Sequence, residues 1–334
     1  MPQTPQVTRR PRAYPPPEFP PRKPKLFART PPAIFPVLLG LVGLALALRR
    51  GAGLIGWSQG PLEALSGALL VGVGFALLAL AVKIARRPAV VLQDMAAITG
   101  KAGYAAASMT VMASAALIAP YSQTTAFAVL LAGLALHAAQ AITVIAVLLR
   151  GPAEARGVTP VWHLNFTGFI VGGMAALALQ ETALAQLILL ATLPVAALIW
   201  GLSLAQLIAR IPPAPLRPLL AIHLAPAALF TTVAQGTGQP LLATAFAGFG
   251  AVILLALLVA SRWITASGFS PIWGAFTFPL TAATSAALGL PAPWHWAGMA
   301  LLILSLGAVP VIAWQVLKLW PAGRLAAKTN AAEA

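Results

Sequence analysis

Apolar residues dominate the chain from Pro32 onward, in long runs separated by short stretches that contain proline, glycine and charge. Each run is close to the roughly 20 residues that a helix needs to cross the hydrocarbon core of a bilayer. The pattern therefore predicts an all-α integral membrane protein with ten transmembrane helices, at residues 33–48, 61–84, 102–119, 124–149, 160–179, 183–208, 216–234, 240–262, 271–289 and 294–318.

Two terminal segments lack this apolar pattern. Residues 1–32 are rich in proline, Lys and Arg, and they contain no continuous apolar stretch of the kind that a secretory signal requires. We interpret them as a disordered cytoplasmic tail. The ten-helix transmembrane domain then occupies residues 33–320, and residues 321–334 form a short cytoplasmic C-terminal tail.

The basic residues support this helix count and predict its orientation. The chain has 21 Lys and Arg against 6 Asp and Glu, a net charge of +15. If the N-terminus is cytoplasmic, every Lys and Arg except Arg49 and Arg50 lies on the cytoplasmic side, as the positive-inside rule requires. We therefore expect a multi-pass protein of the inner membrane with both termini in the cytoplasm. Because the charges are spread between apolar runs, they do not indicate nucleic-acid binding.

The composition narrows the possible chemistry. Hydrophobic residues make up 60% of the chain and charged residues 8%, with no cysteine. There is no thiolate nucleophile, no cysteine-ligated metal site and no HExxH-type motif. We therefore expect neither an enzyme nor a bound metal or cofactor.

The predicted helices recur in pairs, because the odd-numbered helices begin at intervals of roughly 55–68 residues. This repeat predicts five stacked helical hairpins. Pro36, Pro226 and Pro279 fall inside odd-numbered helices, and an intramembrane proline is tolerated where a cavity or a neighbour satisfies the freed backbone group. The odd-numbered helices are therefore candidates for an inner ring, although the prolines also fit ordinary kinks in packed helices.

Three odd-numbered helices place notable residues on one face by their i, i+3, i+7 spacing. These faces are Phe278, Thr281 and Ser285 in the ninth helix; His223, Pro226 and Phe230 in the seventh; and Asn165, Gly168 and Gly172 in the fifth. A narrow pore with an aromatic plug would have this pattern. Tight helix packing would have it too, since Gly168 and Gly172 form a small-xxx-small pattern.

The stretch WGAFTFPLT at 273–281 resembles the ninth-helix pattern of the tellurite-resistance/dicarboxylate transporter family. This family includes the bacterial TehA proteins, slow-type anion channels, malate permeases and sulfite exporters. Weaker matches are LAPA at 224–227 and PPAIF at 31–35. The resemblance implies a pseudo-five-fold bundle whose odd-numbered helices line a central pore, assembled as a homotrimer. It also implies that Phe278 occludes the pore as a gate.

The charge pattern favours anions as the transported species. Glu63 and Glu181 lie at helix ends, and no acidic residue lies at mid-membrane, whereas a cation pathway usually carries carboxylates. Chloride, nitrate, sulfite, tellurite and dicarboxylates all fit such a conduit. Besides the gate, the candidate pore-lining residues are Phe35, Ser108, Asn165, His223, Phe230, Thr281 and Ser285.

The alternative is a proton-coupled or exchange carrier for dicarboxylate, sulfite or tellurite, which would need a titratable relay. Four histidines are available. His163 and His295 lie beside tryptophans near helix ends, which predicts interfacial positions. His137, with Gln140 three residues later on the fourth helix, fits an interhelical hydrogen-bond pair. His223 is the best relay candidate, although a packing role is favoured for it as well.

Overall fold

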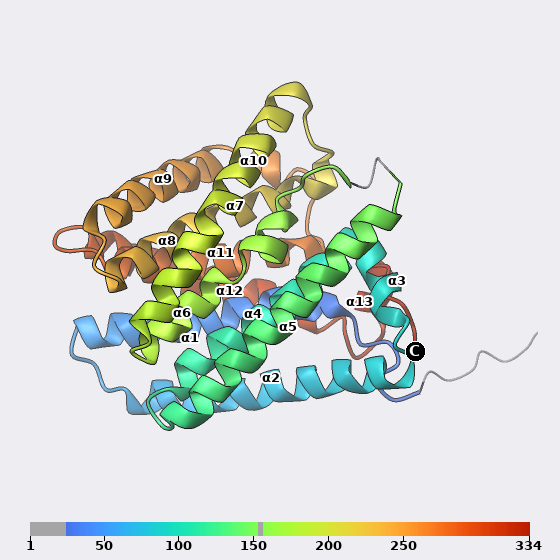
Figure 1. Cartoon of the computed structure of the whole chain (residues 1–334), viewed down its shortest axis with the longest axis horizontal. Coiled ribbons are helices and arrows are strands. Elements are labelled where there is room, and N and C mark those ends of the chain that lie inside the picture. The colour runs from blue at the N-terminus through green and yellow to red at the C-terminus, as the bar shows by residue number, and fades with distance from the viewer. Residues whose placement is uncertain (1–24, 153–155) are drawn as a thin grey trace, which may run out of the picture.

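The computed structural model describes residues 25–152 and 156–334, and these form a bundle of helices (Figure 1). Each of the ten predicted apolar segments coincides with a long helix or with a helix preceded by a short turn of 3-10 or π geometry. The ten helices are α1 (Phe35–Leu54), α2 (Gly60–Arg86), α4 (Ile98–Ile118), α5 (Gln123–Arg150), α6 (Ile170–Ala178), α7 (Thr182–Ala209), α8 (Leu224–Gly236), α9 (Pro240–Val259), α11 (Gly274–Leu288) and α12 (His295–Leu317). Shorter helices are α3 (Val90–Ala96), α10 (Ser261–Ile264) and α13 (Arg324–Lys328).

Seven helical stretches in the described part of the chain are long and apolar enough to cross a membrane. They contain α1, α2, α5, α7, α8, α9 and α12. The protein is therefore an integral membrane protein with several spans. The other three predicted helices, α4, α6 and α11, are shorter or more polar, which is physically acceptable because they pack among other helices rather than against lipid.

The helices divide into an inner and an outer set. The inner set is α1, α4, α6, α8 and α11, and each of these helices contacts the next, with α11 returning to α1. Each inner helix also contacts the longer helix that follows it, namely α2, α5, α7, α9 or α12. Burial follows the division, since 72% of the α1 span is buried but only 11% of the α9 span. In Figure 1, α2 runs along one edge of the bundle and α9 lies near the opposite edge.

Glycines allow the inner helices to approach closely. Gly40 and Gly43 of α1 face α11: a Cβ on Gly40 would lie 3.1 Å from the Thr277 carbonyl carbon, and one on Gly43 would lie 3.2 Å from Phe278 Cδ2. Thr277 adds a hydrogen bond from its Oγ1 to the Pro36 carbonyl oxygen, at 3.0 Å. The contact between α1 and α11 joins the first inner helix of the chain to the last, so that the contacts among the inner helices form a closed cycle.

The prolines have a different role from the one that their spacing suggested. Pro36 lies at the second residue of α1 and Pro226 at the third of α8, where the missing backbone N–H costs no intrahelical hydrogen bond. Of the three prolines predicted to interrupt odd-numbered helices, Pro279 alone lies beyond the first turn of its α-helix. Irregular turns instead precede four inner helices, at Pro32–Ile34, His163–Thr167, Ala214–His223 and Pro271–Trp273.

The two ends of the described chain, near residue 25 and at residue 334, lie close together on the bundle. Of the predicted N-terminal tail, residues 1–24 lie outside the described residues, while 25–32 pack against the helices, with the Phe27 ring centroid 5.6 Å from that of Phe75. In the predicted C-terminal tail, the α13 side chain Leu325 is fully buried. Arg29 Nε lies 2.8 Å from Glu333 Oε2, and the Ala334 N–H donates to the Ala28 carbonyl at 3.1 Å.

A buried ion pair joins this C-terminal segment to three helices. Lys83 Nζ of α2 lies 2.8 Å from Asp94 Oδ2 of α3, and neither side chain is exposed. The Tyr104 hydroxyl of α4 donates to the same oxygen at 3.1 Å, and the Ala332 N–H donates to Asp94 Oδ1 at 2.6 Å. Asp94 therefore has hydrogen bonds on both oxygens, as a buried carboxylate needs.

Gly40→Ala should destabilise the protein, because the added Cβ meets the backbone of α11 and that backbone cannot rotate away. We expect a loss of about 1–3 kcal/mol in the free energy of unfolding, the usual cost of overpacking, measured as a lower thermal midpoint in detergent. Gly72→Ala in α2 is the control, since no heavy atom lies within 4 Å of its Cβ position and alanine has the higher helix propensity. Equal shifts in both variants would contradict the close α1–α11 contact.

Asp94→Asn should cost about 3 kcal/mol or more, because it leaves the Lys83 ammonium buried without its counter-charge. Glu333→Gln is the matched control. Its pair with Arg29 has both side chains 47% exposed, so its loss should cost less than about 1 kcal/mol. Thermal unfolding of both variants tests the difference, and a double variant Lys83→Met, Asp94→Leu should recover part of the stability. An Asp94→Asn variant as stable as Glu333→Gln would refute the structural role of the buried pair.

Candidate functional site

Three cavities follow one another along the inner helices. The first cavity, of about 40 Å³, lies among the starts of these helices, and its lining includes Pro36, Ala102, Leu164, Ile222 and Ala275. The middle cavity, of about 10 Å³, is lined by Gly43, Leu46, Met174, Leu229, Thr232, Phe278, Thr281, Ala282 and Ser285. Every residue that lines these two cavities comes from an inner helix or from the turn that precedes one.

The third cavity, which we call the arginine vestibule, lies at the opposite ends of the inner helices and measures about 950 Å³. Its lining includes Arg49, Arg50, Ala116, Leu177, Gln235 and Gly289. It shares Leu46, Met174, Thr232 and Ser285 with the middle cavity. The middle cavity therefore adjoins the vestibule.

Among the α11 residues that line the middle cavity, Phe278 is the one nearest in sequence to the first cavity. Ala275, three residues earlier on α11, lines the first cavity, whereas Phe278 lines the middle one. The Phe278 side chain is 4% exposed, and the missing side chain at Gly43 gives its ring room beside α1. Along α11, the linings of the two cavities are therefore one helical turn apart, from Ala275 to Phe278.

Thr281 and Ser285 continue the same face of α11 toward the vestibule. Both line the middle cavity, and Ser285 also lines the vestibule. The Thr281 hydroxyl donates to the Phe278 carbonyl oxygen at 3.0 Å, so its hydrogen already forms a hydrogen bond within α11. The structure thus brings together the three residues that the ninth-helix pattern placed on one face.

The remaining predicted pore-lining residues do not line any of these three cavities. Phe35 is fully buried at the start of α1. Ser108 Oγ lies 2.8 Å from His137 Nδ1, and Asn165 Oδ1 accepts a hydrogen bond from Gln140 Nε2 at 2.6 Å. His137 and Gln140 are both residues of α5. Ser108 and Asn165 thus form polar contacts that join α4 and the turn before α6 to the outer helix α5.

His223 and Phe230 also contact other helices. His223 Nδ1 lies 3.0 Å from His163 Nε2, and the Trp200 indole donates to the His223 carbonyl at 3.2 Å. The Phe230 ring packs 4.9 Å from Phe246 and 6.0 Å from Trp200, on α9 and α7. His163, which was predicted at an interfacial position, is 1% exposed and therefore buried among the helices.

Gly168 and Gly172 support helix packing. A Cβ on Gly168 would come within 2.8 Å of His137 Nε2, and one on Gly172 within 2.8 Å of Leu134 Cδ2. Both contacts are with α5. The small-xxx-small pattern in this segment therefore brings α6 and the turn before it close to α5, the outer helix that follows α4.

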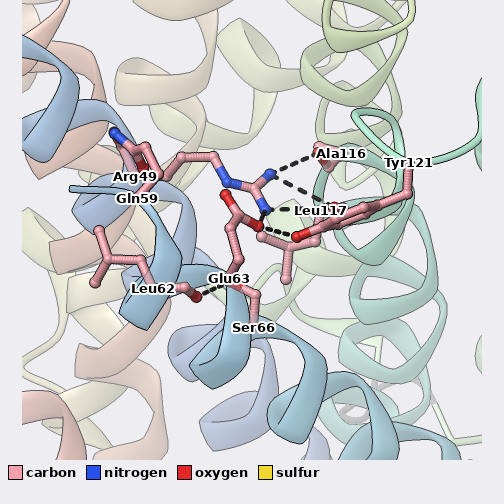
Figure 2. Close-up of polar contacts among 8 residues, drawn as sticks. All are labelled: Arg49, Gln59, Leu62, Glu63, Ser66, Ala116, Leu117 and Tyr121. Atoms are coloured by element: carbon pink, nitrogen blue, oxygen red, sulfur yellow. Dashed lines mark hydrogen bonds and ion pairs between the residues drawn. The ribbon is translucent and has the colours of Figure 1, made fainter.

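A polar cluster at the arginine vestibule was not predicted from the sequence (Figure 2). Arg49 Nη2 of α1 lies 2.6 Å from Glu63 Oε2 of α2. The Tyr121 hydroxyl donates to the same Glu63 oxygen, and this hydrogen bond raises the pKa of Tyr121. Arg49 Nη1 also approaches the Ala116 and Leu117 carbonyl oxygens at the end of α4, each at 3.5 Å. The cluster joins the adjacent ends of α1, α2 and α4. The signal for it in the sequence is that Glu63 follows the two consecutive arginines, Arg49 and Arg50, within a short stretch.

The family model for voltage-dependent anion channels (SLAC1) matches residues 29–317, almost all of the transmembrane domain. The chain belongs to this family. The match confirms the resemblance carried by the ninth-helix motif and assigns the chain to a family of membrane proteins for anion transport. No curated protein sequence matches the chain.

The charges in this member of the voltage-dependent anion channel family agree with an anionic ligand. No Asp or Glu is among the described residues that line the three cavities. The inner helices begin at the first cavity, so their partly positive N-terminal ends gather there. Their partly negative C-terminal ends gather at the vestibule, where Arg49 and Arg50 bind terminal carbonyls of α4 and α11. Arg49 is paired with Glu63, so Arg50 in particular offsets a potential that would repel an anion.

Proposed function

We propose that the chain is a conduit for small anions, such as chloride, nitrate, sulfite, tellurite or a dicarboxylate, with Phe278 as the gate of a central pore. The observation that supports the proposal is that Phe278 lines the middle cavity one helical turn after Ala275 of the first cavity, and that only inner-helix residues and their preceding turns line both cavities. A ring at such a boundary blocks passage by filling space. A change of its χ1 rotamer would open it.

The architecture that we propose for this conduit is ten transmembrane helices arranged as five hairpins with pseudo-five-fold symmetry. It is supported by the closed order of contacts among α1, α4, α6, α8 and α11, and by the contact of each with the outer helix that follows it. In this arrangement Thr281 and Ser285 line the pore beside the gate. Phe35, Ser108, Asn165, His223 and Phe230 hold the surrounding helices in place.

Orientation and assembly complete the proposal. The positive-inside distribution supports an inner-membrane protein with both termini in the cytoplasm, so that the arginine vestibule opens to the outside. A homotrimer rests on the family resemblance. The outer helices that would meet lipid or neighbouring subunits carry large exposed apolar side chains, such as Phe75, Leu255 and Trp314.

The contrasting mechanism is a proton-coupled or exchange carrier. Its best-supported relay would be the pair His163 and His223, whose ring nitrogens are 3.0 Å apart. Neither histidine is among the described residues that line the three cavities. A proton on this pair would therefore not meet the transported anion directly, which favours the conduit.

Phe278→Ala should increase anion current in oocytes or flux in liposomes by about tenfold, equivalent to a barrier lower by about 1.4 kcal/mol, because truncation joins the first and middle cavities. Phe276→Ala is the matched control on the same helix, since Phe276 packs 5.7 Å from Trp273. It should leave the current unchanged. Equal currents from wild type and a correctly inserted Phe278→Ala variant would exclude Phe278 as the gate.

Reversal potentials of the Phe278→Ala current should follow the anion gradient, with a shift of about 59 mV for a tenfold change in chloride or nitrate. They should not respond to a pH gradient, because no titratable relay enters the pathway. A reversal potential that tracks the proton gradient, and that loses this dependence in His223→Ala, would instead identify a carrier.

A further inference from the structure

Two consecutive arginines line the arginine vestibule, but their surroundings differ. The Arg49 guanidinium forms an ion pair with Glu63 and is partly buried. Arg50 is exposed and takes part in none of the ion pairs within the described part of the chain. Among the described lining residues of this vestibule, Arg50 is thus the cation without a carboxylate partner.

The guanidinium of Arg50 is held in one place without being saturated. Its Nη1 donates to the Ser285 carbonyl oxygen at 3.0 Å. An arginine has five N–H donors arranged in a planar fork, so this single bond orients the group and leaves other donors toward the vestibule. An oriented guanidinium loses less entropy when it binds a ligand than a free side chain does.

Gly289 makes room for a second polar group beside it. A Cβ on Gly289 would lie 2.7 Å from Arg50 Cζ and 2.9 Å from Gln235 Oε1, so the guanidinium and the amide both border this position. The Gln235 Oε1 atom is buried and has no hydrogen-bond partner among the described residues. A side-chain amide carries two donors on its nitrogen, and a half turn exchanges nitrogen and oxygen. In that orientation Gln235 adds an N–H donor next to Arg50.

We propose that Arg50 and Gln235 form an anion-binding site in the arginine vestibule, selective for planar oxyanions such as nitrate or a carboxylate over a halide. Two parallel N–H donors of a guanidinium match two oxygens of a planar oxyanion, whereas a spherical halide cannot use this geometry. The Ser285 carbonyl positions the fork and Gly289 leaves the space. The site deepens the proposed function, because it would receive an anion at the outer end of the same pathway.

The positive charge of Arg50 also changes the electrostatic potential of the vestibule. Each helix C-terminus carries a partial charge of about −0.5, and the inner helices end around this vestibule. Glu63 neutralises Arg49, so Arg50 supplies the unpaired positive charge in the vestibule. An anion bound at Arg50 therefore occupies a favourable position in surroundings that would otherwise repel it.

Protection from arginine modification tests the site on purified wild-type protein. Phenylglyoxal modification, followed by peptide mass spectrometry, measures the reaction rates of Arg50 and of the exposed Arg262 in one sample. At constant ionic strength, replacing chloride by nitrate should slow modification of Arg50 about threefold and leave Arg262 unchanged. An unchanged Arg50 rate, or equal slowing at both residues, would overturn the proposal. Because this measurement needs no open pathway, it is independent of the Phe278 gate.

Two variants test the geometry, each combined with the conducting variant Phe278→Ala. The half-saturating anion concentration is measured for each, with the anion added on the side of the vestibule. Arg50→Lys keeps the charge and loses the fork, and Gly289→Ala keeps the arginine and displaces its guanidinium. Each should raise the half-saturating nitrate concentration about three- to fivefold and change that for chloride less. Arg262→Lys is the matched control and should change neither value. Wild-type nitrate values in both folded variants would overturn the proposed recognition.

Discussion

The contact between α1 and α11 is the interaction on which the arrangement of the inner helices depends. It joins the first inner helix of the chain to the last, and it requires Gly40 and Gly43, because a side chain at either position would meet α11 within van der Waals distance. Lipid offers no hydrophobic gain when two apolar helices associate, so close packing and interhelical hydrogen bonds must supply the stability. Thr277, bonded to the Pro36 carbonyl, contributes such a bond. The same glycine that permits the contact, Gly43, also gives the Phe278 ring its place.

Electrostatics vary along the inner helices because all five begin at the same end. Their N-terminal ends surround the first cavity, where partial positive charge favours an anion without any side chain. At the C-terminal ends the sign reverses, and the vestibule contains two arginines that bind the terminal carbonyls of α4 and α11. Acidic residues are absent from the described linings. A chain with few charges can thus favour anions at both ends by different means.

Several of the polar contacts that hold the helices together lie away from the three cavities. The ends of the described chain are fastened by the buried pair of Lys83 and Asp94 and by the docked C-terminal segment. The polar contacts of Ser108 and Asn165 hold inner helices to α5. The first and middle cavities contain few polar side chains, so an anion passing through them would be bound weakly and released readily.

The sequence by itself determined the positions of the ten apolar helices, because length and hydropathy respond directly to the bilayer. Its ninth-helix motif also placed Phe278, Thr281 and Ser285 on one face, since helical spacing is a local property. Only the tertiary structure decided which way the other faces turn. Ser108, Asn165 and Phe230 have the same spacing whether they point toward a cavity or toward an outer helix, and helix rotation depends on the side chains of the neighbours. The pairing of Arg49 with Glu63, which leaves Arg50 unpaired, likewise depends on contacts between helices that periodicity does not encode.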